Sequence, residues 1–405
     1  MNSQPRKGGA RPNRGALHRT PGDTEGSSRQ PNGGLQSPAY KAREWASSFR
    51  TLGAGPGLAL AVSRWPLRHL GRPERKDDIM FKKSAWLLSA LVLTACQQDI
   101  DFQDGLPTED TVKLNIPASD SQAQRLTSAG QGVRAFAQGD VSGFYLISLG
   151  SVLLVNGTTA YTLAGLAAVA STKPASVNGD TATFGPYTPA GSPTTWRLTV
   201  TRTDPARFTY GLDGKPKDSA DSAYVPVLSG NHSVSVGKDN RAMRGYGEGS
   251  FLLEWENATR LANQPLKKGS AEFRYTRASP SETVRVEVDL REFQGDNPRP
   301  FTAMYRFAEV PGGEGSFAFA YDSNIHWFDS TRQAPERLGI KTRWKSNGEG
   351  RSDVRVSGGD LTAAGTLSEC WDTRFRSTVL VRSDNYETWG TESTGCAFPT
   401  PSYAD

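Results

Sequence analysis

Cysteine and histidine are scarce in this chain of 405 residues, which has 3 cysteines and 4 histidines. The His-Glu-x-x-His and Cys-x-x-Cys motifs of metal and dithiol sites do not occur, nor does a glycine-rich phosphate-binding motif. The Gly-x-Ser-x-Gly elbow that presents a nucleophilic serine is absent too. These absences argue against the common zinc, dithiol, nucleotide and serine-hydrolase sites, and we expect no metal and no cofactor.

The net charge of +5 misrepresents most of the chain. Residues 1–96 hold 16 of the 47 basic side chains and 6 of the 42 acidic ones, which leaves 31 basic and 36 acidic side chains for the other 309 residues. Since the larger part is mildly acidic, the sequence does not predict a partnership with nucleic acid.

A targeting signal is indicated from Met80 onward. Lys82 and Lys83 precede an apolar run from about Ala85 to Leu93, and Leu93-Thr94-Ala95-Cys96 follows. A positive start, a short apolar run and a small-residue cleavage site are typical of a secretory signal. The last four residues resemble the lipobox of bacterial lipoproteins, which implies a signal peptide over 80–95 and a lipid on the sulfur of Cys96. An ordinary signal peptide that ends by chance in a cysteine is the alternative.

The same resemblance bears on location. Gln97 follows the cysteine, where an aspartate would favour the inner membrane, so we expect a lipid-anchored protein of the cell envelope, in the outer membrane. Because a signal peptide acts at the start of a chain, residues 1–79 are interpreted as a gene-start overcall, or else as a disordered basic leader. Residues 96–137 are polar and mixed and are interpreted as a tether.

With Cys96 lipidated, Cys370 and Cys396 remain. An even pair in an oxidising compartment predicts a disulfide, with two separate thiols as the alternative.

No charged residue occurs between Asp140 and Lys173. Apolar residues recur there near helical spacing, so we expect a buried helix, or two helices bent at Asn156-Gly157, packed on a sheet. A hairpin of two apolar strands and a transmembrane helix are the alternatives.

After Pro174 the apolar period changes to two, which marks half-buried strands. The alternation is clearest in 196–201, 251–256, 272–275, 284–291, 340–345 and 353–356. With turn signals between such stretches, we predict about eleven strands in one mainly β domain over 138–405. Its expected fold is an antiparallel meander, a curved sheet or barrel, with the apolar helix packed on it. A membrane-embedded barrel is the alternative, disfavoured by the dense charged faces.

Two sets of residues merit attention as possible catalysts. Glu287, Asp289 and Glu292 resemble the Glu-x-Asp-x-x-Glu signature of retaining glycosidases, which implies a nucleophile and a general acid at the two glutamates. Regular pleating would place Glu292 on the opposite face, so a β-bulge would be required. His232 and His326 lie near turn signals and are interpreted as surface or rim histidines.

The segments Glu369-Cys370-Trp371 and Gly395-Cys396-Ala397 resemble an uncharacterised family of bacterial lipoproteins with a C-terminal Cys-Trp … Cys-Ala pair. The resemblance implies an exported domain and brings no activity. We therefore expect a lipid-anchored envelope protein without enzymatic activity that binds a hydrophobic small molecule or acts structurally. The alternative is a secreted carbohydrate hydrolase that uses Glu287 and Glu292.

Overall fold

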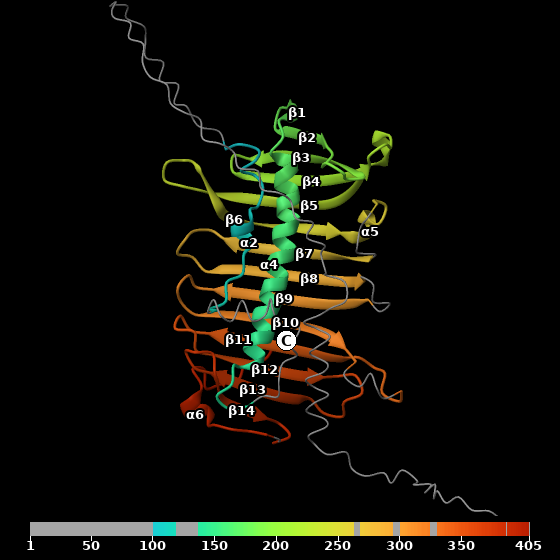
Figure 1. Ribbon diagram of the computed structural model, residues 1–405. Coiled ribbons are helices and arrows are strands. Elements are labelled where there is room, and N and C mark those ends of the chain that lie inside the picture. The colour runs from blue at the N-terminus through green and yellow to red at the C-terminus, as the bar shows by residue number, and fades with distance from the viewer. Residues whose placement is uncertain are drawn as a thin grey trace, which may run out of the picture. The chain divides into compact units, whose positions relative to one another are not determined.

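The structure, a computed structural model, describes residues 100–118, 137–262, 268–294, 300–324, 330–385 and 387–404. Its main feature is a sheet of fourteen antiparallel strands, each paired with its neighbours in sequence (Figure 1). The strands are β1 (Pro174–Asn178), β2 (Thr181–Tyr187), β3 (Thr194–Asp204), β4 (Arg207–Pro216), β5 (Val225–Val236), β6 (Ala242–Glu254), β7 (Lys268–Arg277), β8 (Val284–Gln294), β9 (Phe301–Glu309), β10 (Gly315–Ser323), β11 (Glu336–Trp344), β12 (Gly350–Ser357), β13 (Gly365–Trp371) and β14 (Ser377–Arg382).

This architecture confirms the predicted antiparallel meander. The sheet is open, because β1 and β14 are its two ends and do not pair with each other. The barrel that remained possible from the sequence is therefore not formed, and the number of strands exceeds the predicted eleven.

The period-two alternation produces continuous rows of side chains across the sheet. One row on the face that bears the core passes from β2 to β13 through directly opposed residues. Its members are Ala182, Val200, Tyr210, Gly230, Phe251, Phe273, Val288, Tyr305, Phe319, Ile340, Val354 and Leu367. A Cβ at Gly230 would lie 2.6 Å from the ring of Tyr210, so only glycine leaves room for that ring.

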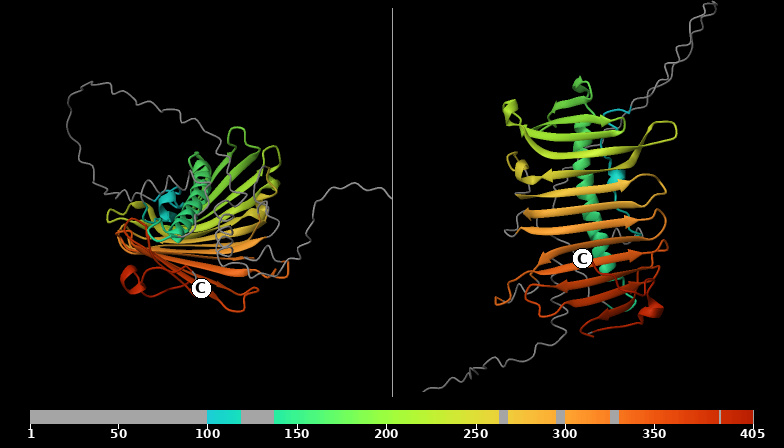
Figure 2. Two further views of the ribbon diagram at one scale, coloured as in Figure 1. Left: turned by 60° about the horizontal axis from the view of Figure 1, so that its bottom comes forward. Right: turned by 180° about the vertical axis from the view of Figure 1, so that it is seen from behind.

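Helix α4 (Gly143–Ala170) runs across the strands on this face, and the sheet curves around it (Figures 1 and 2). Its buried side chains, such as Phe144, Val152, Leu163 and Leu166, belong to the same hydrophobic cluster as the sheet residues. The backbone of α4 approaches β2 and β3 at one end and β11 and β12 at the other. The predicted helix is confirmed. It is continuous, so neither the hairpin nor a bend at Asn156-Gly157 is formed.

The side chain of Asn156 binds another segment of the chain. Its amide accepts a hydrogen bond from the backbone N–H of Leu114 at 2.9 Å and donates one to the Leu114 carbonyl at 2.8 Å. Asn156 therefore serves as a docking point for another segment. Gly157 lies on the exposed side of the helix, where a Cβ would meet nothing within 4 Å.

Residues 100–118 form that other segment, which we call the strap. The strap runs antiparallel to α4: Gln103 donates to the carbonyl of Ala170 at 2.9 Å, and the carbonyl of Pro117 accepts from Tyr145 at 2.9 Å. It contains the short helix α2 (Glu109–Val112), and it buries Leu106, Val112, Leu114 and Ile116 in the core.

The tether predicted over 96–137 is therefore wrong for residues 100–118, since apolar residues on alternate positions anchor them to the domain. The alternation Val112, Leu114, Ile116 was the sequence signal for this. Residues 119–136 lie outside the described residues.

Candidate functional site

The N-terminus of α4 is seated on a buried carboxylate. Glu369 of β13 is 1% exposed, and its Oε2 accepts hydrogen bonds from the Ser142 hydroxyl at 2.7 Å and the Phe144 N–H at 3.0 Å. Burial raises the pKa of Glu369, while the hydrogen bonds from the helix start act to lower it. A carboxyl oxygen at this position accepts hydrogen bonds from groups at the helix start that have no partner within the helix.

A second set of polar contacts between α4 and the sheet lies one turn further along the helix. The hydroxyls of Ser148, Thr342 and Ser352 form a chain with oxygen–oxygen distances of 2.5 and 2.6 Å, and all three residues are fully buried. Elsewhere the helix faces an apolar layer rich in aromatic rings. Phe251 and Phe273 stack with centroids 4.4 Å apart, and Phe317 and Phe319 lie 5.4 Å apart.

The opposite side of α4 is partly exposed although it is apolar. Leu153, Leu154 and Tyr161 are 41%, 42% and 69% exposed, and the rest of that side consists of small or uncharged residues. By length and composition α4 could cross a membrane. Only 33% of its most apolar stretch is buried in the structure, less than is usual for a helix in a protein core. A helix that is apolar all round suits a position with apolar material on both sides.

Glu287 and Asp289 lie on the outer face of the sheet, on the far side from α4. Asp289 accepts hydrogen bonds from Arg274 and, at 2.6 Å, from Arg306, and Glu287 lies 3.3 Å from Arg274 and 3.7 Å from Arg306. Partial burial acts to raise the pKa of Asp289, but the two arginines outweigh it and lower that pKa. The pair is thus part of a charged network across β7, β8 and β9.

Glu292 lies within a break in the regular register of β8, between Leu290 and Phe293, and has a φ of 47°. The bulge that a glycosidase arrangement would require is therefore present. The carboxylate of Glu292, however, pairs with Lys268 at 3.0 Å and raises the pKa of that lysine, whereas Glu287 pairs with arginines. Arg274 and Arg306 each contact both Glu287 and Asp289. Glu292 is paired with Lys268 instead.

A shallow depression of about 640 Å³ lies on the outer face over β3 to β8. Glu287 is among its lining residues and Glu292 is not. Most of the lining residues have polar side chains, and Arg207, Glu248 and Arg285 are among them. A hydrophobic molecule that filled the depression would desolvate these charged side chains.

His232 is buried, at 3% exposed, so its interpretation as a surface or rim residue is wrong. Its Nδ1 lies 3.0 Å from the hydroxyl of Tyr275 on the core side of the sheet. Burial lowers the pKa of His232 to about 4, so the ring is neutral at pH 7. The alternation around it, in Asn231-His232-Ser233, was too polar to indicate a core position. His326 lies outside the described residues.

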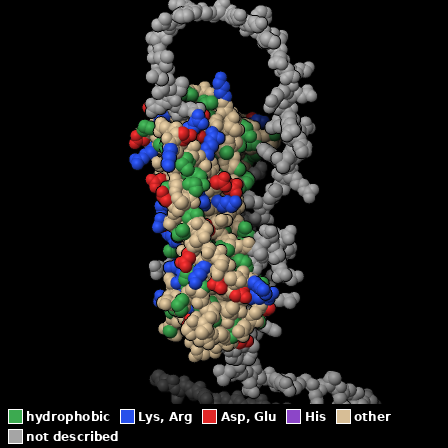
Figure 3. All heavy atoms as spheres, turned by 90° about the vertical axis from the view of Figure 1, so that its left-hand side faces the viewer, with side chains coloured by type: hydrophobic (Ala, Val, Ile, Leu, Met, Phe, Trp, Pro, Cys, Tyr) green, Lys and Arg blue, Asp and Glu red, His purple; other side chains and the backbone are tan. Residues whose placement is uncertain are grey.

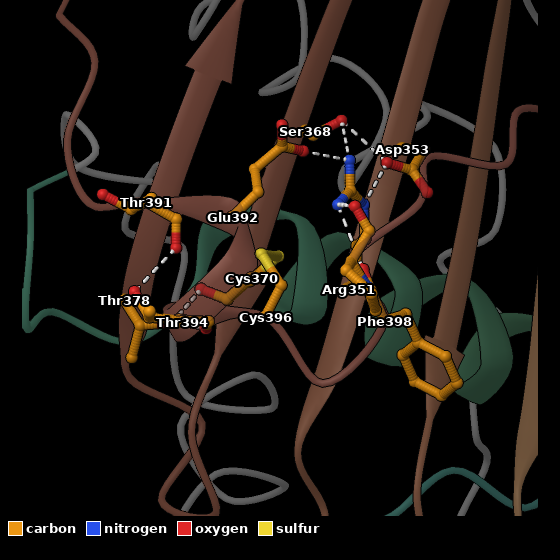
Figure 4. Close-up of a disulfide and its surroundings, with 12 residues drawn as sticks. Arg351, Asp353, Ser368, Cys370, Thr378, Thr391, Glu392, Thr394, Cys396 and Phe398 are labelled. Atoms are coloured by element: carbon orange, nitrogen blue, oxygen red, sulfur yellow. Dashed lines mark hydrogen bonds and ion pairs between the residues drawn. A yellow bond between two sulfur atoms is a disulfide. The ribbon is translucent and has the colours of Figure 1, made fainter.

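The predicted disulfide between Cys370 and Cys396 is confirmed, and it fixes the C-terminal segment to the outer face of β11 to β14 (Figure 4). Beneath that segment, Arg351 and Asp353 are fully buried and lie 2.6 Å apart. Arg351 also reaches Glu392 of helix α6 (Glu392–Gly395) at 2.6 Å and the carbonyls of Phe398 and Pro399. The alternation over 353–356 indicated a solvated face for Asp353, because the pattern could not show that the tail returns to cover this face.

Other surfaces carry mixed charges. Figure 3 shows basic, acidic and apolar side chains interspersed on one side of the molecule. Among the described residues, no group of three or more histidine, cysteine or acidic side chains could hold a metal ion.

No family model, curated protein or solved structure shows significant similarity to the chain. The lipobox, the signal peptide over 80–95 and Cys96 lie outside the described residues, as do residues 1–79. The lipoprotein resemblance therefore stays a prediction, and of its structural implications the disulfide is seen.

Proposed function

We propose that this chain is a lipid-anchored protein of a bacterial cell envelope, in the outer membrane, that binds a hydrophobic molecule between α4 and the sheet. The observation that carries the proposal is that α4 has no charged side chain over 28 residues and lies on an aromatic layer while its other side stays partly exposed. The anchor itself rests on the sequence around Cys96.

The contacts of α4 support this function. Among the described residues, most of the contact between the helix and the sheet is apolar, and the polar contacts include Ser148–Thr342 and those of the helix N-terminus with Glu369. A ligand with an acyl chain or rings that entered this layer would replace apolar contacts with apolar contacts, so no buried polar group would lose a partner. Polar side chains line the depression on the outer face, which makes it the poorer candidate.

The glycosidase hypothesis has less support. Glu287 and Glu292 are engaged by different basic side chains, and one of them lies outside the depression that the other lines. A general acid for glycoside cleavage must be free to reach the glycosidic oxygen, whereas the carboxylate of Glu292 is paired with Lys268 at 3.0 Å.

The anchor is tested by labelling cells that express the full chain with radioactive palmitate. We expect label in the wild-type protein and none in Cys96→Ser. Equal labelling of the two, or no labelling of either, would contradict lipidation at Cys96.

Ligand binding is tested with the wild-type protein and a fluorescent fatty acid, together with native mass spectrometry for lipid that copurifies. In the variant Ser148→Cys/Thr342→Cys, a disulfide would hold α4 against β11, because the two hydroxyls lie 2.5 Å apart. Oxidation of this variant should abolish uptake of the probe, and reduction should restore it, while Ser148→Cys alone should behave like wild type. Absence of both bound lipid and uptake in wild type would leave a structural role instead.

A further inference from the structure

The strap fixes the position of the lipid anchor relative to the domain. Ile100 accepts a hydrogen bond at its carbonyl from Arg202 of β3, and the ring of Phe102 packs edge-on against Phe208, with centroids 6.5 Å apart. Asp104 pairs with Arg244 at 2.8 Å. Residue 100 is thus held on the domain and does not begin a free linker.

Only four residue steps separate Cys96 from Ile100. Even a fully extended chain spans at most about 14 Å over that distance. If Cys96 carries the lipid, the part of the domain around Ile100 must lie close to the bilayer surface, and the rest of the domain extends from there.

The surface next to Ile100 can be identified from backbone contacts. Arg202 also donates its N–H to the carbonyl of Asp180, in the turn between β1 and β2, at 2.7 Å. Gln103 contacts Ala170 at the end of α4. The edge strand β1 and the C-terminal half of α4 are therefore the neighbours of Ile100, and we call this surface the β1 end.

The exposed side chains of the β1 end suit a lipid surface. Tyr161 is 69% exposed and Val177 is 55% exposed, and small residues lie exposed between them in the chain. Charged residues are absent from 141–172, and Lys173 and Asp180 flank β1. Placing this surface against a bilayer would bury apolar area and desolvate few charges.

We infer that the β1 end is the membrane-facing surface of the protein and that the bilayer to which Cys96 is anchored covers it. This inference rests on the lipid anchor of the proposed function and not on ligand binding. It orients the domain: β1 lies at the membrane, and the disulfide end lies away from it.

Three exposed valines lie at increasing distances from the β1 end and can therefore report the distance of each position from the bilayer. Val177, Val236 and Val310 are 55%, 40% and 48% exposed and lie at or just beyond the ends of β1, β5 and β9. Because strand direction alternates along an antiparallel meander, these three ends point to the same side of the sheet. At about 4.8 Å per strand, Val236 and Val310 lie about 19 and 38 Å from Val177 along the sheet.

The experiment uses the full lipoprotein purified with its anchor and reconstituted in phospholipid vesicles. Variants Val177→Cys, Tyr161→Cys, Val236→Cys and Val310→Cys each carry a fluorophore on the new thiol, since Cys96 is blocked and the other cysteines form the disulfide. Vesicles contain either plain lipids or lipids with a nitroxide on the headgroup. The loss of emission should be greatest at positions 177 and 161, smaller at 236 and absent at 310.

Each other outcome is informative. Equal loss at all positions, greater loss at 310, or no loss at 177 and 161 in protein that floats with the vesicles would overturn the inference. No loss would mean that another occupant, such as a segment of this chain, covers the surface. Protein that fails both to float and to take up palmitate would instead refute the anchor of the proposed function.

Discussion

The two ends of the sheet differ in how their edges are protected. At the β14 end, Leu380 exchanges two backbone hydrogen bonds with Trp389, and Ser377 pairs with Gly139 and Asp140. The tail and the disulfide cover the outer face there. At the β1 end, the edge strand has five residues, starts with proline, contains a bulge and is mostly exposed. Covering an edge with other segments of the chain, and keeping an edge strand short and bulged with a proline in it, are both known ways to prevent a sheet edge from pairing with another chain.

This difference indicates a division of roles. The β14 end is held by a network of buried charges, a covalent bond and the contacts at the start of α4, so the loss of one partner there would leave buried polar groups unsatisfied. The β1 end has few such interactions and adjoins the predicted anchor. We therefore expect substitutions to affect stability unequally at the two ends.

The largest effect is expected for Arg351→Ala. It would leave the Asp353 carboxylate, which is fully buried, without its closest cation. Breaking one side of a buried ion pair costs about 3–5 kcal/mol. Urea unfolding followed by tryptophan fluorescence would measure the change, and a loss below that of Arg197→Ala would refute the importance of this network.

Removal of the disulfide by Cys370→Ser/Cys396→Ser should have an effect of nearly the same size. The two residues are 26 apart in sequence, and closing such a loop stabilises by about 3.5 kcal/mol in the chain-entropy model. Wild-type protein unfolded with reductant should match the double variant. If reductant does not alter the wild-type midpoint, the bond contributes nothing to stability.

His232 provides a probe of the middle of the sheet. Its pKa is lowered from 6.5 to about 4, so the unfolded chain binds a proton between these values that the folded chain does not. Stability is therefore lost as pH falls from 6.5 through 4, by about 3 kcal/mol at 1.36 kcal/mol per unit. His232→Phe should remove this dependence, as measured by the urea midpoint at pH 7 and pH 4. If the urea midpoint changed equally between pH 7 and pH 4 in the two proteins, the histidine would be accessible to solvent in the folded state.

Glu369→Gln should change the pH profile in the opposite sense. The pKa of Glu369 is raised in the folded state, so the folded protein binds the extra proton, and wild-type stability falls as pH rises above about 4.5. Glutamine can still accept hydrogen bonds from Ser142 and Phe144 but does not ionise. Melting temperatures between pH 4 and 8 should therefore decline less in the variant, and a steeper decline would contradict this assignment.

The smallest effect is expected near the β1 end, for Arg197→Ala. Arg197 pairs with Asp213 at 2.8 Å, but their side chains are 37% and 25% exposed. Exposed pairs of this kind contribute about 0–1 kcal/mol. A loss comparable to that of Arg351→Ala, measured by the same urea titration, would remove the contrast between the ends.

The sequence predicted the strands and the helix well because each depends on local period. Val284 to Leu290 alternates and forms β8, and the charge-free run after Asp140 forms α4. The disulfide followed from the number of cysteines and the assumed compartment.

What the sequence did not predict depends on segments that return from far along the chain. The strap covers the side of α4, and the tail covers Arg351 and Asp353, so charges that alternate like a solvated face became buried. The burial of His232 likewise follows from its row in the sheet, which only the register reveals. The candidate carboxylates were located correctly on β8, but their basic partners come from β7 and β9.

The contact between the N-terminus of α4 and Glu369 has a consequence for the order in which parts of the domain can fold. Every strand pairs with its neighbour in sequence, so each hairpin can form as soon as its two strands are available. The contact between Ser142 and Glu369 instead spans 227 residues, and the bridge between Val141 and Arg376 joins residues that are still farther apart in sequence. The Ser142 hydroxyl caps the Tyr145 N–H locally, but the start of the helix gains its carboxyl partner only when β13 has been added, so a chain truncated before β13 would keep the serine cap and lack the Glu369 contact.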